Sequence, residues 1–181
     1  MSRDRSPQAR RLDVGAFAAS GEGLEGQSAL SDLGRLRENL MPLPGDAVPA
    51  PVRWSARGEL RPVAAGAPQP WLSLGVDSTV TLQCQRCLQP MASALAVDRW
   101  FRFAADETEA ARLDEETDED VLVTSRSFDL IALIEDELIL ALPIVPRHEA
   151  CPEPLLPAPA GAGDTDRPFA ALAALRRQRG G

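Results

Sequence analysis

The chain has 181 residues, of which 44% are hydrophobic and 25% are charged, and its formal net charge at pH 7 is −8. This length suits one domain with terminal extensions. No apolar run approaches the ~20 residues that span a bilayer, and no apolar stretch follows the basic amino terminus as in a secretory signal. The three cysteines, an odd number, fit a reducing compartment. We therefore expect a cytoplasmic protein with no membrane partner.

The first segment with a clear pattern is residues 28–40, where leucines recur at helical spacing after serines that can cap a helix. This pattern predicts a helix that ends before the prolines of residues 42–51. Residues 1–24 have no comparable pattern and are expected to be a flexible N-terminal arm.

The strand signals follow, and the longest is residues 71–84, with leucine and valine at even positions and polar residues at most odd ones. Alternation with a period of two indicates a strand with one wet face. Residues 93–103 alternate in the same way, so the two segments are expected to form an antiparallel hairpin. Shorter strands are predicted at 52–56 and 60–64, with a turn at 58–59 between them.

A helix over residues 128–142 is expected to cover the apolar face of these strands. Ser127 is its predicted N-cap, and isoleucine and leucine side chains form one stripe along it. Glu135 falls within this stripe; either it orders the cysteine region through Arg86, or it reaches solvent from the edge of the stripe. The predicted fold class is α+β: an antiparallel sheet with a long Cys-x-x-Cys-tipped hairpin, packed by one central helix, in a single domain over 25–151 with flexible termini.

Negative charge is concentrated in residues 105–120, which hold nine acidic residues and one arginine. The ordinary interpretation of such a run is a solvated acidic loop. The alternative is a decoy for a basic partner, or a guard that keeps nucleic acid away from one face.

Prolines and glycines over residues 152–167 predict a linker. Residues 168–181 follow as a short helix and a basic tail, and Phe169, Leu172 and Leu175 form an apolar strip on that helix. A helix this short is marginal in water by itself. It is therefore expected either to dock on a partner as a recognition element or to fold back over exposed core of its own domain.

All three cysteines and the only histidine lie in two short segments, 84–87 and 148–151. A Cys-x-x-Cys turn directs two thiolates at one ion, and a His-x-x-Cys segment can supply two more ligands. Three sulfurs and one imidazole nitrogen suit one structural Zn²⁺ with no position left for a catalytic water. The alternative is a set of reduced thiols; a redox pair is disfavoured because Pro90 and a strand, not a helix, follow the turn. The candidate ligands are Cys84, Cys87, His148 and Cys151.

Residues 82–88, 128–148 and 168–175 resemble the YceD family, the large ribosomal RNA subunit accumulation proteins of bacteria, which have plant organelle relatives. The resemblance spans about residues 50–176, with the three motifs in family order and an acidic stretch between the first two. It implies a role in the synthesis, processing or stability of large-subunit (23S-type) ribosomal RNA, and hence in ribosome assembly. The residues agree with a protein that is not an enzyme, since one histidine, no lysine and no phosphate-binding glycine loop leave little for catalysis.

Two classes of function stay open. The first is a factor that acts on large-subunit ribosomal RNA or its precursor particle, and the second is an acidic adaptor that binds a ribosomal protein or a processing enzyme and affects RNA indirectly. An acidic chain is unsuited to broad binding of nucleic acid backbones, and no DNA partner is expected. A direct RNA contact would have to be local and would use the tail arginines or Arg53, Arg57, Arg61 and Arg86.

Overall fold

The computed structural model describes residues 6–43, 48–63 and 66–152, which fold around a five-stranded sheet. Strand order follows chain order, and neighbouring strands are antiparallel except the last pair, which is parallel. The strands are β1 (Gly23–Ser28), β2 (Val52–Arg61), β3 (Gln69–Gln83), β4 (Pro90–Ala104) and β5 (Asp120–Val123). The expected α+β fold with a long cysteine-tipped hairpin is confirmed, whereas β1 and β5 were not predicted from the alternation.

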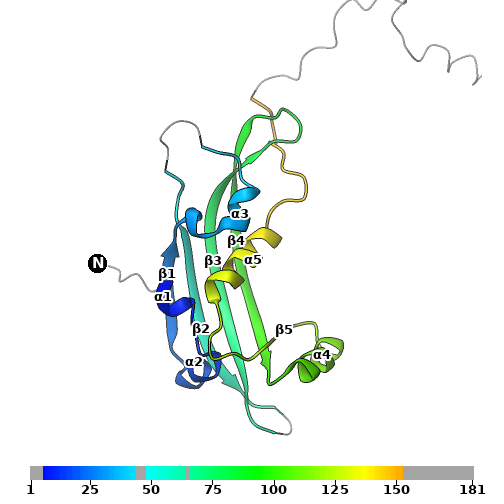
Figure 1. Ribbon diagram of the computed structural model, residues 1–181. Coiled ribbons are helices and arrows are strands. Elements are labelled where there is room, and N and C mark those ends of the chain that lie inside the picture. The colour runs from blue at the N-terminus through cyan, green and yellow to red at the C-terminus, as the bar shows by residue number, and fades with distance from the viewer. Residues whose placement is uncertain (1–5, 44–47, 64–65, 153–181) are drawn as a thin grey trace, which may run out of the picture.

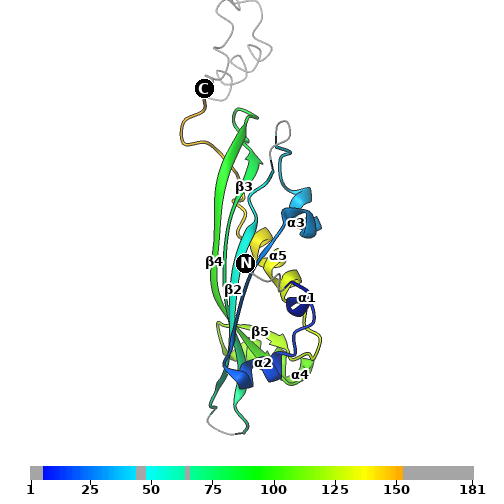
Figure 2. The same cartoon turned by 90° about the vertical axis from the view of Figure 1, so that its left-hand side faces the viewer.

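The helices of the described residues leave one face of the sheet bare, as Figures 1 and 2 show. They are α1 (Ser6–Ala9), α2 (Val14–Ser20), the 3-10 helix η1 (Leu30–Asp32), α3 (Gly34–Glu38), α4 (Glu107–Glu116) and α5 (Leu130–Leu140). Most of them pack on the opposite face, while α4 lies beside β5 at one end of the sheet. None of these helices is long and apolar enough to cross a membrane.

Alternation along β3 separates the core from the bare face. The even-numbered residues Leu72 and Leu74 are fully buried under the helices, whereas the odd-numbered Asp77 and Thr79 are exposed. A strand directs successive side chains to opposite faces, so one face of the sheet is apolar and the other is polar. This is the layered arrangement that the sequence predicts.

The helix predicted over residues 128–142 forms as α5 and packs on the apolar face of the sheet. Its N-cap is Asp129, not Ser127: the Asp129 carboxylate accepts a hydrogen bond from the Ala132 amide at 3.0 Å. An acid at this position also interacts favourably with the positive end of the helix dipole. Three residues of the predicted stripe are at most 1% exposed: Ile131, Ile134 and Leu138.

The prediction of one helix over residues 28–40 is wrong. Ser28 ends β1, and its hydroxyl accepts a hydrogen bond from Trp54 Nε1 at 3.2 Å. Three of the leucines that suggested a helix, Leu30, Leu33 and Leu36, are buried and belong to η1, to α3 and to the residue between them, whereas Leu40 follows α3. Gly34, a poor residue for the interior of a helix, begins α3.

The prediction of a flexible arm over residues 1–24 is wrong for its described part. Leu12 and Phe128 form a backbone bridge with two N–H···O bonds of 2.9 Å, and Asp13 caps α2. The apolar side chains of this segment are buried: Ala9, Leu12, Val14 and Phe17. Elements this short give little periodicity in the sequence, yet they close part of the core.

The turn predicted at residues 58–59 is absent, because β2 continues through it to Arg61. A Cβ atom at Gly58 would lie 2.8 Å from backbone atoms of Phe17 and Ala18. The glycine therefore permits α2 to cross closely over β2, and it does not reverse the chain. A second strand over 60–64 is correspondingly wrong.

The acidic segment predicted as a loop over residues 105–120 contains α4 and the first residue of β5. Asp106 caps α4 by accepting a hydrogen bond from the Glu109 amide at 2.9 Å. Acids in the first turn stabilise a helix through its dipole. Ala110 and Leu113 are buried in a small second core with Ala104, while most of the acidic side chains are exposed as expected.

The close approach at Gly58 gives a stability prediction. Gly58→Ala should lower the free energy of unfolding by about 1–3 kcal/mol, because α2 must move away from β2. The control is Gly34→Ala, where the added Cβ meets no atom within 4 Å and a helix position is improved. Chemical denaturation of both variants checks this; equal stabilities would contradict the packing of α2 described above.

Candidate metal centre

The first half of the candidate centre is the turn between β3 and β4. The Cys84 amide donates to the Gln89 carbonyl at 3.0 Å, and the Leu88 amide donates to the Cys84 carbonyl at 2.8 Å. Leu88 has a φ of 62°, so the chain reverses through a left-handed residue. This turn holds Cys84 buried and Cys87 partly buried at the tip of the hairpin.

The second half is the segment that follows α5 and runs beside the hairpin toward its tip (Figure 1). The Gln85 amide donates to the Pro146 carbonyl at 2.8 Å. The Arg86 guanidinium donates to the carbonyl oxygens of His148 and Glu149. Backbone and side-chain hydrogen bonds therefore hold this segment against the turn, 62 residues away along the chain.

These contacts bring all four predicted ligands together. Their donor atoms lie within 4.8 Å of one another, and Cys87 Sγ is 3.4 Å from His148 Nδ1. Zinc bonds of about 2.3 Å to sulfur and about 2.0 Å to nitrogen place two such ligands about 3.5 Å apart in a tetrahedron. Two zinc-bound sulfurs lie about 3.8 Å apart, so a contraction of about 1 Å or less would complete the geometry. The donor set can hold a metal ion, and zinc suits it chemically.

The protein prepares Cys84 for this role. Burial opposes ionisation of the thiol, but hydrogen bonds from the backbone of His148, Cys87 and Arg86 outweigh it and lower its pKa to about 5. The His148 amide lies 3.4 Å from Cys84 Sγ. Burial, and hydrogen bonds to the other two cysteines, raise the pKa of Cys151. Since the thiolate is the form that binds metal, the centre has one strong ligand ionised at neutral pH.

Glu135 takes no part in this centre. It is 8% exposed, and its Oε2 pairs with Arg35 Nη2 of α3 at 3.1 Å. Its Oε1 accepts a hydrogen bond from the Leu36 amide at 3.1 Å. The hypothesis that Glu135 orders the cysteine region through Arg86 is therefore wrong, because Arg86 contacts the backbone of residues 148–149 instead.

A second buried carboxylate on α5, Glu137, was not singled out by the sequence pattern. It is 6% exposed and pairs with Arg99 Nη1 of β4 at 3.1 Å. Arg99 in turn pairs with Asp120 at the start of β5. The available signal was Arg99 at a core-facing position of β4: its side chain is 42% exposed, but its place in the strand directs it toward α5 and a carboxylate there.

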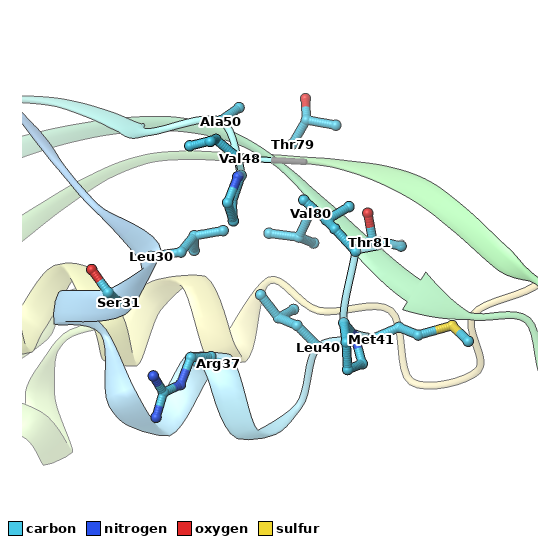
Figure 3. A pocket seen from close by; sticks show the side chains of 13 residues that line it. Leu30, Ser31, Arg37, Leu40, Met41, Val48, Ala50, Thr79, Val80 and Thr81 are labelled. Atoms are coloured by element: carbon cyan, nitrogen blue, oxygen red, sulfur yellow. The ribbon is translucent and has the colours of Figure 1, made fainter. Parts of the chain in front are cut away.

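An apolar groove of about 710 Å³ lies between the segment η1–α3 and β3 (Figure 3). Leu30, Leu40 and Val80 point toward one another across it. The Met41 amide donates to the Thr81 carbonyl at 2.8 Å and closes one end. The predicted strip Phe169, Leu172 and Leu175, like most of the predicted linker, lies outside the described residues.

The comparisons with known proteins concern the same region. The family model described as "Large ribosomal RNA subunit accumulation protein YceD" matches residues 72–176. The protein with that name from Haemophilus influenzae is 37% identical over 75 residues, which are 41% of this chain and 43% of that protein. The chain thus aligns with less than half of that relative, and no solved structure shows significant similarity. The family model covers more than half of the chain and both halves of the candidate centre, so this protein belongs to the YceD family.

Proposed function

We propose that this protein is a non-enzymatic factor in the synthesis, processing or stability of large-subunit (23S-type) ribosomal RNA and that it acts in ribosome assembly. Family membership over residues 72–176 is the observation that carries this proposal. The family's description names accumulation of an RNA and no catalytic activity. The candidate centre supports a structural role, because four protein ligands would fill a tetrahedral metal and leave no position for a reacting water. Ribosome assembly implies a cytoplasmic site of action, where free cysteines stay reduced.

The proposal is tested in cells that lack the protein. The ratio of large-subunit to small-subunit ribosomal RNA should fall, because only the first depends on this factor. Expression of the full chain from a plasmid should restore the ratio. A parallel fall of both RNAs, or a normal ratio, would contradict the proposal.

The second candidate function is an acidic adaptor that binds a ribosomal protein or a processing enzyme. The observation that favours it is α4, which presents Asp114 and Glu115 to solvent on an ordered helix. Neutralising both residues should abolish capture of basic ribosomal proteins while leaving capture of naked RNA unchanged. The control neutralises two other exposed acids, Asp32 and Glu38. If the variant lost RNA binding but still captured basic ribosomal proteins, the adaptor function would be contradicted.

We further propose that the candidate centre holds one structural zinc. Protein purified without chelator should contain about one zinc per chain. Zinc at about 100 times its dissociation constant stabilises a protein by about 2.7 kcal/mol, so its removal should lower the melting temperature by roughly 5–10 °C. His148→Ala should lose the metal, and Arg147→Ala should keep it. If the purified protein contained no zinc, the cysteines would be reduced thiols and not metal ligands. If the two variants contained equal amounts of zinc, His148 would not be a ligand.

The tail is proposed as a recognition element for the assembling particle. Deleting residues 167–181 should leave the melting temperature almost unchanged and abolish rescue of large-subunit RNA. A matched variant changes Phe169, Leu172 and Leu175 to serine and so keeps the length and the arginines. If the tail instead docks in the apolar groove of Figure 3, both variants should melt at clearly lower temperature. Full rescue by either variant would also contradict recognition.

A further inference from the structure

The helices of the described residues leave one face of the sheet bare (Figure 2), and the alternation along β2 determines which of its side chains lie on that face. Trp54 and Ala56 of β2 are buried on the helix side, so the alternate positions Arg53, Arg57 and Arg61 lie on the bare face. These three are all the arginines of β2, and each is a candidate for a local RNA contact. The pairing of β2 with β3, and of β3 with β4, determines which side chains lie beside them.

Two rows across the sheet bring arginine and tryptophan together. Arg57 is opposite Ser73, which is opposite Trp100. In the next row Glu59 is opposite Trp71, which is opposite Arg102. We call Arg57, Arg61, Trp71, Trp100 and Arg102 the Arg–Trp patch. No periodic signal in a single strand reveals it, because its members come from three strands.

Arg61 and Arg102 are held against the tryptophan rings of the patch. The Arg61 guanidinium lies 4.1 Å from the centre of the Trp71 ring and 4.0 Å from that of the Trp100 ring, and Glu59 pairs with it. The Arg102 guanidinium is 5.8 Å from the Trp71 ring, and Gln69 Oε1 accepts a hydrogen bond from Arg102 Nε at 2.6 Å. Trp100 is 37% exposed, so part of its ring is accessible to a ligand, whereas Trp71 is 7% exposed. Planar groups held this way are preorganised to stack on a flat ligand.

The charge of the patch opposes that of the chain. Three arginines face one acid, Glu59, in a protein of formal net charge −8. The rows nearer the hairpin tip are not basic, since Glu25 and Asp98 flank the next row and Asp77 is opposite Arg53. On the other side Glu109 of α4 accepts a hydrogen bond from Gln69 at 3.3 Å, so the acidic helix borders the patch. The positive area is therefore small and has negative borders.

We propose that the Arg–Trp patch binds a single-stranded segment of ribosomal RNA. An unpaired base stacks on the exposed part of Trp100, and Arg57 and Arg102 contact the adjoining phosphates. An open sheet face with aromatic and arginine side chains suits unpaired bases, since every base offers a flat π-face. The acidic borders repel any longer run of phosphates, so binding is local. The identity of the nucleic acid as ribosomal RNA rests on the proposed function; the patch itself rests on the contacts above.

Fluorescence anisotropy tests the patch with the full-length protein and labelled single-stranded oligo(U), oligo(A) and unpaired fragments of large-subunit RNA. Trp100→Ala should weaken binding roughly 5- to 150-fold, the range for loss of one base–aromatic stack. Trp100→Phe should keep most of the affinity, because it keeps a stacking ring. Melting curves of both variants identify any loss of folding.

The arginines are tested through salt dependence. Arg57→Ala with Arg102→Ala should reduce the slope of log affinity against log salt by roughly 1.4, since each phosphate contact to a single strand contributes about 0.7. The control, Arg112→Ala with Arg126→Ala, removes the same charge from exposed positions outside the patch and should leave the slope nearly unchanged. Equal effects of the two pairs would mean general charge attraction and would overturn the proposal.

Three further outcomes show whether the patch binds RNA and whether that binding and the proposed function fail independently. Patch variants that bind RNA normally, in a protein that still restores large-subunit RNA in cells, would overturn the patch and leave the function standing. Variants that lose binding to an acidic peptide such as oligoglutamate, but not to RNA, would assign the patch to a protein partner. Patch variants that lose RNA binding support the inference even if the RNA ratio in cells does not depend on the protein.

Discussion

The position of α5 determines how the helices meet the sheet. Its apolar stripe covers the sheet, but apolar packing alone tolerates sliding and rotation of a helix. Two buried carboxylates remove that freedom: Glu135 pairs with Arg35 of α3, and Glu137 pairs with Arg99 of β4. The arginines are about half exposed, so each pair adds little net stability, yet a misplaced helix would leave a carboxylate buried and unpaired, which is costly. The pairs therefore act mainly as a register for α5.

The candidate metal centre depends on that register. β3 and β4 extend past the shorter strands of the sheet (Figure 1), and Leu88 in the turn at their tip is 61% exposed. The segment leaving α5 reaches this tip only if the helix ends where it does, and Arg86 then binds the carbonyls of His148 and Glu149. A metal bound by both segments would connect the tip to α5 over a separation of more than sixty residues. Such a link would stabilise the end of the hairpin in addition to its apolar contacts.

Sequence patterns identified the parts of this fold that repeat regularly over many residues. The alternation in β3 and β4, the stripe of α5 and the grouping of Cys84, Cys87, His148 and Cys151 are long or chemically specific signals, and the structure contains each of them. The sequence patterns did not predict the short elements or the features that depend on tertiary contacts. α1, α2 and β5 are too short for a period, Gly58 has its role because α2 crosses above it, and the partner of Glu135 lies 100 residues away. No local pattern encodes a contact at that distance.

The two faces of the sheet have different physical roles, and this bears on how an acidic protein could act on RNA. The helix face uses its charged residues for internal pairs, so Arg35 and Arg99 are committed to carboxylates of α5. On the bare face, the Arg61 guanidinium lies over the Trp71 and Trp100 rings and pairs with Glu59. A net charge of −8 weakens non-specific attraction to RNA backbones. A small basic patch within such a chain therefore gains selectivity at the expense of affinity, because only a ligand that also stacks on Trp100 obtains enough contacts to stay bound.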